Sequence, residues 1–147
     1  MFRKYHYLNT DINKSSKCFC MTVNDKIAGF ISVIMFPHPK QPYRKVHRLV
    51  ILPDYQGIGL SKILLNFMGT IINDYPFAIT TSNPALINSL KNDNNWICTS
   101  SHRGAAGHQG LKSLNKTAST KRIITTFVFK NKDKKVKYSG TNAQRKK

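Results

Sequence analysis

The stretch ILPDYQGIGLSK, residues 51–62, places a strand end, a proline, two glycines and the start of an amphipathic run in direct succession. Pro53 has no N–H for a sheet ladder, so it ends the apolar strand before it. Gly57 and Gly59 allow a tight turn and a close approach of the backbone to another molecule. The stretch is either a plain strand-to-helix connection or a turn whose free amides bind a phosphate.

The spacing of these glycines excludes two common phosphate-binding loops. No lysine follows Gly59 where a P-loop requires one, and Lys62 occupies the place of the third glycine in the dinucleotide-binding fingerprint. Whether the stretch binds a phosphate therefore depends on the strands and helices predicted on either side of it.

Strands and helices alternate on both sides of the turn. Residues 25–36 are apolar on both faces, which predicts a strand covered on both sides. Residues 17–23 and 25–36 predict a hairpin joined at Asn24-Asp25-Lys26. Periodicity, caps and turn signals then predict, in order along the chain, a strand over 43–52, a helix over 60–72, a strand over 76–81, a helix from Ser82-Asn83-Pro84, and strands over 96–99 and 121–130. This order predicts an α/β or α+β sheet with a parallel β-α-β unit in its middle.

The helix after the turn carries an apolar stripe that we expect to face the core. Its members are Leu60, Leu64, Phe67, Met68, Ile71 and Ile72.

The charge is strongly positive and unevenly distributed. The chain has 24 Lys and Arg against six acids, all of them Asp, and a formal net charge of +18. Residues 102–147 hold 13 of the basic groups and one acid, Asp133. Such a field attracts the phosphates of a nucleic acid or of a nucleotide cofactor. A solvated tail is the alternative, and we expect residues 131–147 to be a basic, disordered tail after a single domain over 1–130.

Length and composition indicate one soluble, cytoplasmic domain. The 147 residues contain no run of about 18 apolar residues and no signal-like stretch at the N-terminus, so we expect no membrane segment. The three cysteines, Cys18, Cys20 and Cys98, give no disulfide framework and no metal-ligand spacing. We expect buried or half-buried thiols and no metal site.

The turn resembles the loop of the GNAT acetyltransferases, which reads Gln/Arg-x-x-Gly-x-Gly/Ala. Residues 56–61 read QGIGLS, with Ser61 in place of the last small residue, and the apolar strand ending at Pro53 precedes them as it often does in that family. The resemblance covers residues 17–101 and is most detailed to a phage or bacterial group with the blocks HYL, FPHP, LPDYQGIG and SNPALI. It implies a mixed, mostly antiparallel sheet that splays at the strand over 46–52, with helices on both faces. The family usually has a further strand and helix before the hairpin, so we expect a minimal form or a missing start.

The resemblance also implies an acyl-CoA site, with acetyl-CoA as the donor. The backbone of Leu49 and Ile51 would pair with the pantetheine arm, and amides of the turn would hold the pyrophosphate. The full set of cofactor-binding residues is then Leu49, Val50, Ile51, Gln56, Gly57, Ile58, Gly59, Leu60, Ser61 and Asn83. An amine acceptor would attack the thioester directly.

The groups that move the proton depart from the family. Many members use a tyrosine in the second helix and a glutamate base, whereas Ser89 or a neighbour stands at the tyrosine's place and the chain has no Glu. The candidates are His47, Tyr55 and Ser89; a histidine titrates in the range that suits a base. Each is also readily explained by packing or capping.

Three functions remain open at this point. The first is N-acyl transfer to an unknown amine, the second is acyl transfer to a nucleic-acid base, and the third is a non-catalytic nucleic-acid-binding protein. The last two draw on the basic C-terminal third, where His102, Arg103, His108, Lys112 and Lys116, with Trp96, could contact a phosphate backbone or a stacked base. A plain surface loop is the alternative there.

Overall fold

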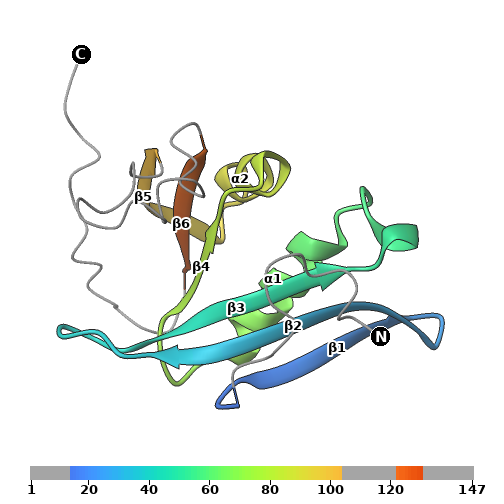
Figure 1. Ribbon diagram of the computed structural model, residues 1–147, viewed down its shortest axis with the longest axis horizontal. Helices are drawn as coiled ribbons and strands as arrows, with labels where there is room; N and C mark the ends of the chain where they lie inside the picture. The colour runs from blue at the N-terminus through green and yellow to red at the C-terminus, as the bar shows by residue number, and fades with distance from the viewer. Residues whose placement is uncertain (1–13, 104–121, 131–147) are drawn as a thin grey trace, which may run out of the picture.

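The computed structural model describes residues 14–103 and 122–130, and these form a six-stranded sheet with two α-helices (Figure 1). Most of the basic loop, residues 101–119, and the predicted tail at 131–147 lie outside this part. The elements are β1 (Lys17–Val23), β2 (Lys26–Phe36), β3 (Tyr43–Ile51), the short 3₁₀ helix η2 (Pro53–Tyr55), α1 (Leu60–Ile71), β4 (Phe77–Thr81), α2 (Pro84–Lys91), β5 (Trp96–Arg103) and β6 (Ile123–Phe129).

The strand order is β1-β2-β3-β4-β6-β5. Only β3 and β4 pair in parallel, and every other neighbouring pair is antiparallel. The predicted mixed, mostly antiparallel sheet with one β-α-β unit is therefore confirmed. β5 runs four residues beyond its predicted end at Thr99, because a register shift between Cys98 and Ser100 lets it continue along β6 as far as Arg103.

The β1–β2 hairpin closes through Asn24 and Asp25, as predicted. Both residues have positive φ, 49° and 60°. Two successive left-handed residues match the twist of the flanking strands, and Asn and Asp tolerate that conformation better than other side-chain-bearing residues.

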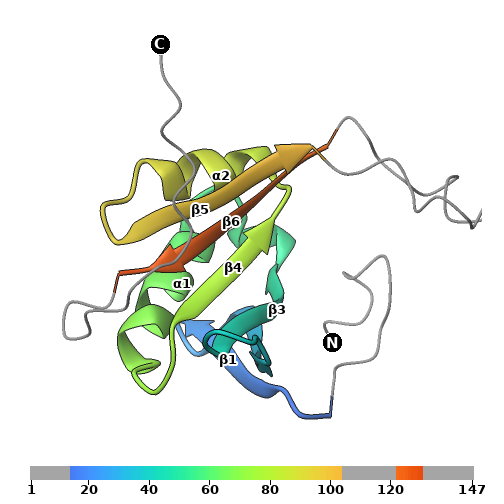
Figure 2. The same cartoon turned by 90° about the vertical axis from the view of Figure 1, so that its left-hand side faces the viewer.

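Both helices cover the same face of the sheet. β3-α1-β4 and β4-α2-β5 advance across the sheet in one direction, and right-handed crossovers then place both helices on one side. Figure 2 shows α1 and α2 together behind β4, β5 and β6. Their buried residues join one cluster with the strands: Ile31, Val33, Val46, Leu64, Leu65, Met68, Phe77, Ile79, Ile87, Leu90, Trp96, Phe127 and Phe129. Among the described residues no helix lies on the other face, where the resemblance implied one. Neither described helix has the length and apolarity that crossing a bilayer requires.

The core face of α1 is rotated from the predicted stripe. Leu65 is fully buried, whereas Phe67 and Ile71 are 59% and 44% exposed. The reason lies at Gly69, where a Cβ would come within 2.5 Å of the Phe129 ring. The helix backbone approaches β6 most closely at this glycine, so the buried face centres on Leu65, Met68 and Gly69. The prediction for Phe67 and Ile71 is wrong.

A polar chain fixes α1 to β5. The indole Nε1 of Trp96 donates to Asn66 Oδ1 at 2.6 Å, and Asn66 Nδ2 donates to Asp93 Oδ2 at 2.9 Å. Burial alone would raise the pKa of Asp93, but the hydrogen bonds from Asn66 and Asn95 and the charge of Lys62 hold that pKa below its usual value. Trp96 is only 5% exposed, so the suggestion that its ring stacks on a nucleic-acid base is wrong.

All three cysteines are exposed, which overturns the expectation of buried or half-buried thiols. Cys18 and Cys20 lie on β1, which is an edge strand of the sheet that the described residues form.

The rotation of α1 predicts opposite effects for two adjacent residues. Met68→Ala should lower the free energy of unfolding by about 2–5 kcal/mol, because it leaves a cavity in the core. Phe67→Ala should change it by less than about 0.5 kcal/mol, as for other exposed positions. Urea denaturation of both variants measures the difference, and a Phe67→Ala loss as large as that of Met68→Ala would contradict the observed helix orientation.

Candidate functional site

The parallel strands β3 and β4 separate soon after they meet. They pair only at Arg44 with Phe77 and at Lys45 with Ala78. Beyond these pairs, β3 continues to Ile51 without a β4 partner, and Figure 1 shows the two strands diverging. The splay expected at 46–52 is therefore present.

A β-bulge at His47 accompanies this separation. Arg48 is opposite Ser32 and Val46 is opposite Val33, so His47 is the extra residue on β3. A bulge bends its strand and increases its twist, and bulges are frequent beside functional sites. It turns the last four residues of β3 away from β4.

The backbone of Leu49 and Ile51 faces the opening between the strands. Leu52 N–H donates to Ala28 O at 2.9 Å, which places Leu52 in a hydrogen-bonded pair with β2. Backbone groups of an antiparallel strand alternate in direction, so Val50 also faces β2 while Leu49 and Ile51 face the other way. Leu49 has no strand partner on that side within the described residues. Its edge is available to an extended chain.

The turn after β3 is stapled to the strand by a side chain. Gln56 Nε2 donates to Ile51 O at 2.7 Å, and Gln56 N–H donates to Pro53 O at 3.1 Å. The backbone N–H of Gln56 therefore donates within the turn. The family resemblance had implied that this N–H would be free to bind the pyrophosphate. The side chain of Gln56 instead sets the direction in which the chain leaves the strand.

Two glycines in the left-handed region then open the turn. Gly57 has φ +82° and Gly59 has φ +84°, where a side chain is strained. A Cβ at either position would meet no atom of the described residues within 4 Å, so no side chain in this part of the chain fills the turn. Gly59 is also the N-cap of α1, and no side chain caps this helix.

The result is a cluster of unused amides at a helix start. Within the described part, none of the backbone N–H groups from Gly57 to Ser61 donates to a protein acceptor. Such groups at a helix N-terminus, reinforced by the helix dipole, bind anions and phosphates in particular. The predicted residues Gly57, Ile58, Gly59, Leu60 and Ser61 are thus brought together.

Asn83 lies at the same edge of the sheet but has a structural task. Its Oδ1 accepts from Leu86 N at 3.2 Å, which caps α2, and its N–H donates to Thr81 Oγ1 at 3.2 Å. Parallel strands run toward the same edge of a sheet, so the turns that begin α1 and α2 both lie at that edge. Within the described residues, the amide NH₂ of Asn83 donates to no protein acceptor.

The three candidates for proton transfer come from three different elements. His47 is exposed at the bulge, Tyr55 is half-buried in η2, and Ser89 is half-buried on α2, one turn after Leu86. Sequence reasoning missed both the bulge and the Gln56 staple. No Gly or Pro marks the bulge in the sequence, whereas the position of Gln56 in the motif was a usable signal.

The basic loop contributes only its first residues to the described structure. His102 and Arg103 end β5 in exposed positions, while His108, Lys112 and Lys116 lie outside the described residues. Over 14–103 and 122–130, no three His, Cys or acidic side chains are grouped to hold a metal ion.

Comparison with known proteins agrees with this geometry. The model of the acetyltransferase (GNAT) family matches residues 2–71, and no curated protein sequence matches. Similar solved structures include a GNAT family acetyltransferase from Elizabethkingia anophelis with acetyl-CoA bound, with TM-score 0.56, 13% identity, and coverage of 80% of this chain and 77% of that one. The resemblance to the GNAT acetyltransferases is confirmed.

Two further structures share the GNAT fold. The ribosomal-protein-S18-alanine N-acetyltransferase of Escherichia coli aligns with TM-score 0.53 and 16% identity over 84% of this chain and 76% of that one. An acetyltransferase of Bacillus anthracis in complex with acetyl coenzyme A aligns with TM-score 0.54 and 12% identity over 81% of this chain. The alignment spans 64% of the Bacillus anthracis chain, which is less than two thirds of its length. At these identities the likeness establishes the fold.

The staple predicts a specific effect of changing Gln56. Gln56→Glu replaces the donor by a carboxylate that faces the Ile51 carbonyl, so the free energy of unfolding should fall by about 1 kcal/mol. Gln41→Glu adds the same charge in the exposed β2–β3 loop and should have no such effect. Urea denaturation compares the two, and equal stabilities would show that the Gln56 hydrogen bond does not hold the turn.

Proposed function

We propose that this chain is an acyl-CoA-dependent N-acyltransferase that uses acetyl-CoA to acylate an amine. The observation that carries the proposal is the row of unused amides from Gly57 to Ser61, beside a strand edge that β4 leaves open. The GNAT fold and the relatives solved with acetyl-CoA support it.

The residues present suit such a donor. The amides from Gly57 to Ser61 would hold a diphosphate, since they are unblocked and lie at a helix start. Leu49 and Ile51 would pair with the amide-containing arm as an added strand, and the Asn83 NH₂ would supply one more donor. Acetyl-CoA would contribute an activated acyl group, and the protein would align an amine with it, because positioning alone removes much of the barrier.

Proton transfer is assigned to groups that this chain possesses. We propose His47 as the base, because it projects from the bulge that opens the sheet. Tyr55 and Ser89 are the candidates for protonating the leaving thiolate. Tyr55 lies in η2, which follows β3, and Ser89 lies in α2, which follows β4. Both elements therefore come after the ends of the two parallel strands.

The acceptor amine is a small molecule, a protein or a nucleic-acid base. The net charge of +18 favours an anionic acceptor, and on this ground a nucleic-acid base is the second candidate. A non-catalytic nucleic-acid-binding protein is the outcome if the turn binds no CoA.

The glycine turn provides the test. Acetyl-CoA should raise the thermal midpoint of the wild type, because a ligand that binds the folded state alone stabilises it by mass action. Gly57→Glu should abolish the shift, since a carboxylate would occupy the place of the phosphate. Gly57→Ala introduces the same backbone strain without charge and should reduce the shift only in part.

Ile63→Ala is the matched control, because it trims an exposed side chain of α1 outside the turn. It should retain the full acetyl-CoA shift. A wild-type shift in Gly57→Glu would contradict the phosphate-binding role of the turn, and no shift in the wild type at saturating acetyl-CoA would contradict the transferase. Turnover with a panel of amines, peptides and oligonucleotides then identifies the acceptor class.

A further inference from the structure

The far end of the β2–β3 hairpin gathers aromatic and cationic side chains on one face. Phe36 and Tyr43 are directly opposite each other, with ring centroids 5.2 Å apart. The ring of His38 approaches Tyr43 edge-on at 6.2 Å, and Lys45 Nζ lies 5.0 Å from the centroid of the Phe36 ring. With the exposed Lys40 of the connecting loop, these five residues form what we call the hairpin patch.

The hairpin patch is partly open to solvent, and no carboxylate of the described residues neutralises its positive charge. Phe36, His38 and Lys40 are exposed, whereas Tyr43 and Lys45 are half-buried. Phe36 is 37% exposed, which is unusual for a residue that typically lies in a core. The ion pairs among the described residues are Arg44–Asp74 and Lys62–Asp93. Lys40 and Lys45 therefore have no carboxylate partner in the described part of the chain, and both charges remain available.

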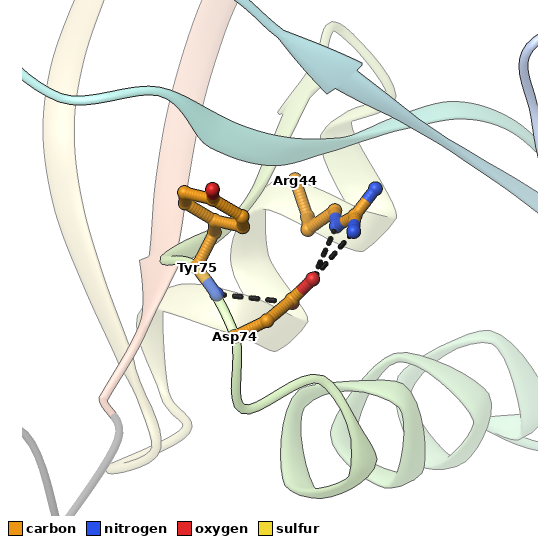
Figure 3. A network of polar contacts seen from close by, with 3 residues as sticks. All are labelled: Arg44, Asp74 and Tyr75. Carbon is orange, nitrogen blue, oxygen red and sulfur yellow. Dashed lines mark hydrogen bonds and ion pairs between the residues drawn. The ribbon is translucent and has the colours of Figure 1, made fainter.

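On the opposite face of the hairpin, Arg44 fixes β3 to the segment that precedes β4. Arg44 forms an ion pair with Asp74, and its guanidinium lies 5.6 Å from the Tyr75 ring centroid (Figure 3). Its backbone N–H also donates to Pro76 O at 2.8 Å. The hydrogen bond from Arg44 holds the pKa of Asp74 below its usual value, so the pair stays charged near neutral pH. Alternation along β3 places Tyr43 and Lys45 on the other face.

The connecting loop is pre-organised. Pro37, Pro39 and Pro42 restrict its backbone, and Lys40 N–H donates to His38 Nδ1 at 3.3 Å. Ordering a flexible loop opposes binding, so a loop that is already restrained loses less conformational entropy when it binds a partner.

We propose that the hairpin patch binds single-stranded nucleic acid. Bases would stack on Phe36 and Tyr43, and Lys40 and Lys45 would contact the flanking phosphates; stacking rings beside basic groups are the recurring means of holding a single strand. The net charge of +18 draws polyanions toward the protein. The patch lies at the start of β3 and the glycine turn beyond its end, so this site is separate from the proposed acyl-CoA site.

The test is fluorescence anisotropy with a fluorescein-labelled, mixed-sequence single-stranded 12-mer, titrated at several salt concentrations. Phe36→Leu keeps an apolar side chain but removes the stacking ring, and it should weaken binding at least about fivefold. Phe36→Tyr keeps a ring and should bind like the wild type. Lys45→Gln should weaken binding and reduce the slope of log affinity against log salt by roughly 0.7.

Phe67→Leu is the matched control, because it makes the same change on the exposed face of α1 and should leave binding unaltered. Wild-type affinity in Phe36→Leu, or no binding by the wild type, would overturn the proposal. Displacement of the 12-mer by polyglutamate at equal charge would also overturn it, since charge alone would then suffice. Thermal melting checks that each variant is folded. The shift in thermal midpoint that acetyl-CoA causes should be the same in Phe36→Leu as in the wild type, so the nucleic-acid proposal and the acyl-CoA proposal are tested separately.

Discussion

The separation of β3 from β4 is the constraint on which the rest of the site depends. Two parallel strands that stayed paired would use the backbone groups of Leu49 and Ile51 in their own ladder. The bulge at His47 prevents this by turning the end of β3 away after two residue pairs. The opening is stable because β2 continues to hold the other edge of β3 as far as Ile51, and because α1 packs its buried face over the same strands.

The turn after β3 carries the features for which we propose anion binding. Gln56 uses its side chain to fasten the turn to Ile51, and Gly57 and Gly59 then take left-handed conformations. α1 begins with no side-chain cap, although an N-cap side chain would stabilise the isolated helix by about 1 kcal/mol. α2 differs, because Asn83 Oδ1 accepts from Leu86 N and so caps that helix. A helix start left uncapped beside an open strand is consistent with an external ligand completing it.

Local features of the sequence predicted most of the framework. The Asn24-Asp25 turn, the stop at Pro53 and the cap at Asn83 each depend on a few adjacent residues, and the structure contains all three. The insertion of β6 between β4 and β5 could not be predicted, because it is a long-range pairing without a local signal. The rotation of α1 depended on Gly69 meeting Phe129, two residues 60 positions apart.

The candidate site likewise contains features that the sequence predicted and features that depend on long-range contacts. Its glycines and the exposed edge of β3 were predicted through the family motif, whereas the bulge at His47 and the staple at Gln56 are properties of the folded chain. The hairpin patch was missed because its rings and cations meet only when β2 and β3 pair. The sequence indicated the basic loop together with Trp96 instead. Trp96 is buried at the start of β5 and donates a hydrogen bond to Asn66.

Amide chemical shifts test the central claim most directly. A ¹H–¹⁵N correlation spectrum of the labelled protein, recorded during titration with coenzyme A, reports each backbone N–H separately. The largest shifts should fall on the amides of Gly57 to Ser61 and on those of Leu49 and Ile51, while the amides of Phe36 and Tyr43 stay unchanged. Saturable binding that leaves the amides of Gly57 to Ser61 unshifted would contradict it.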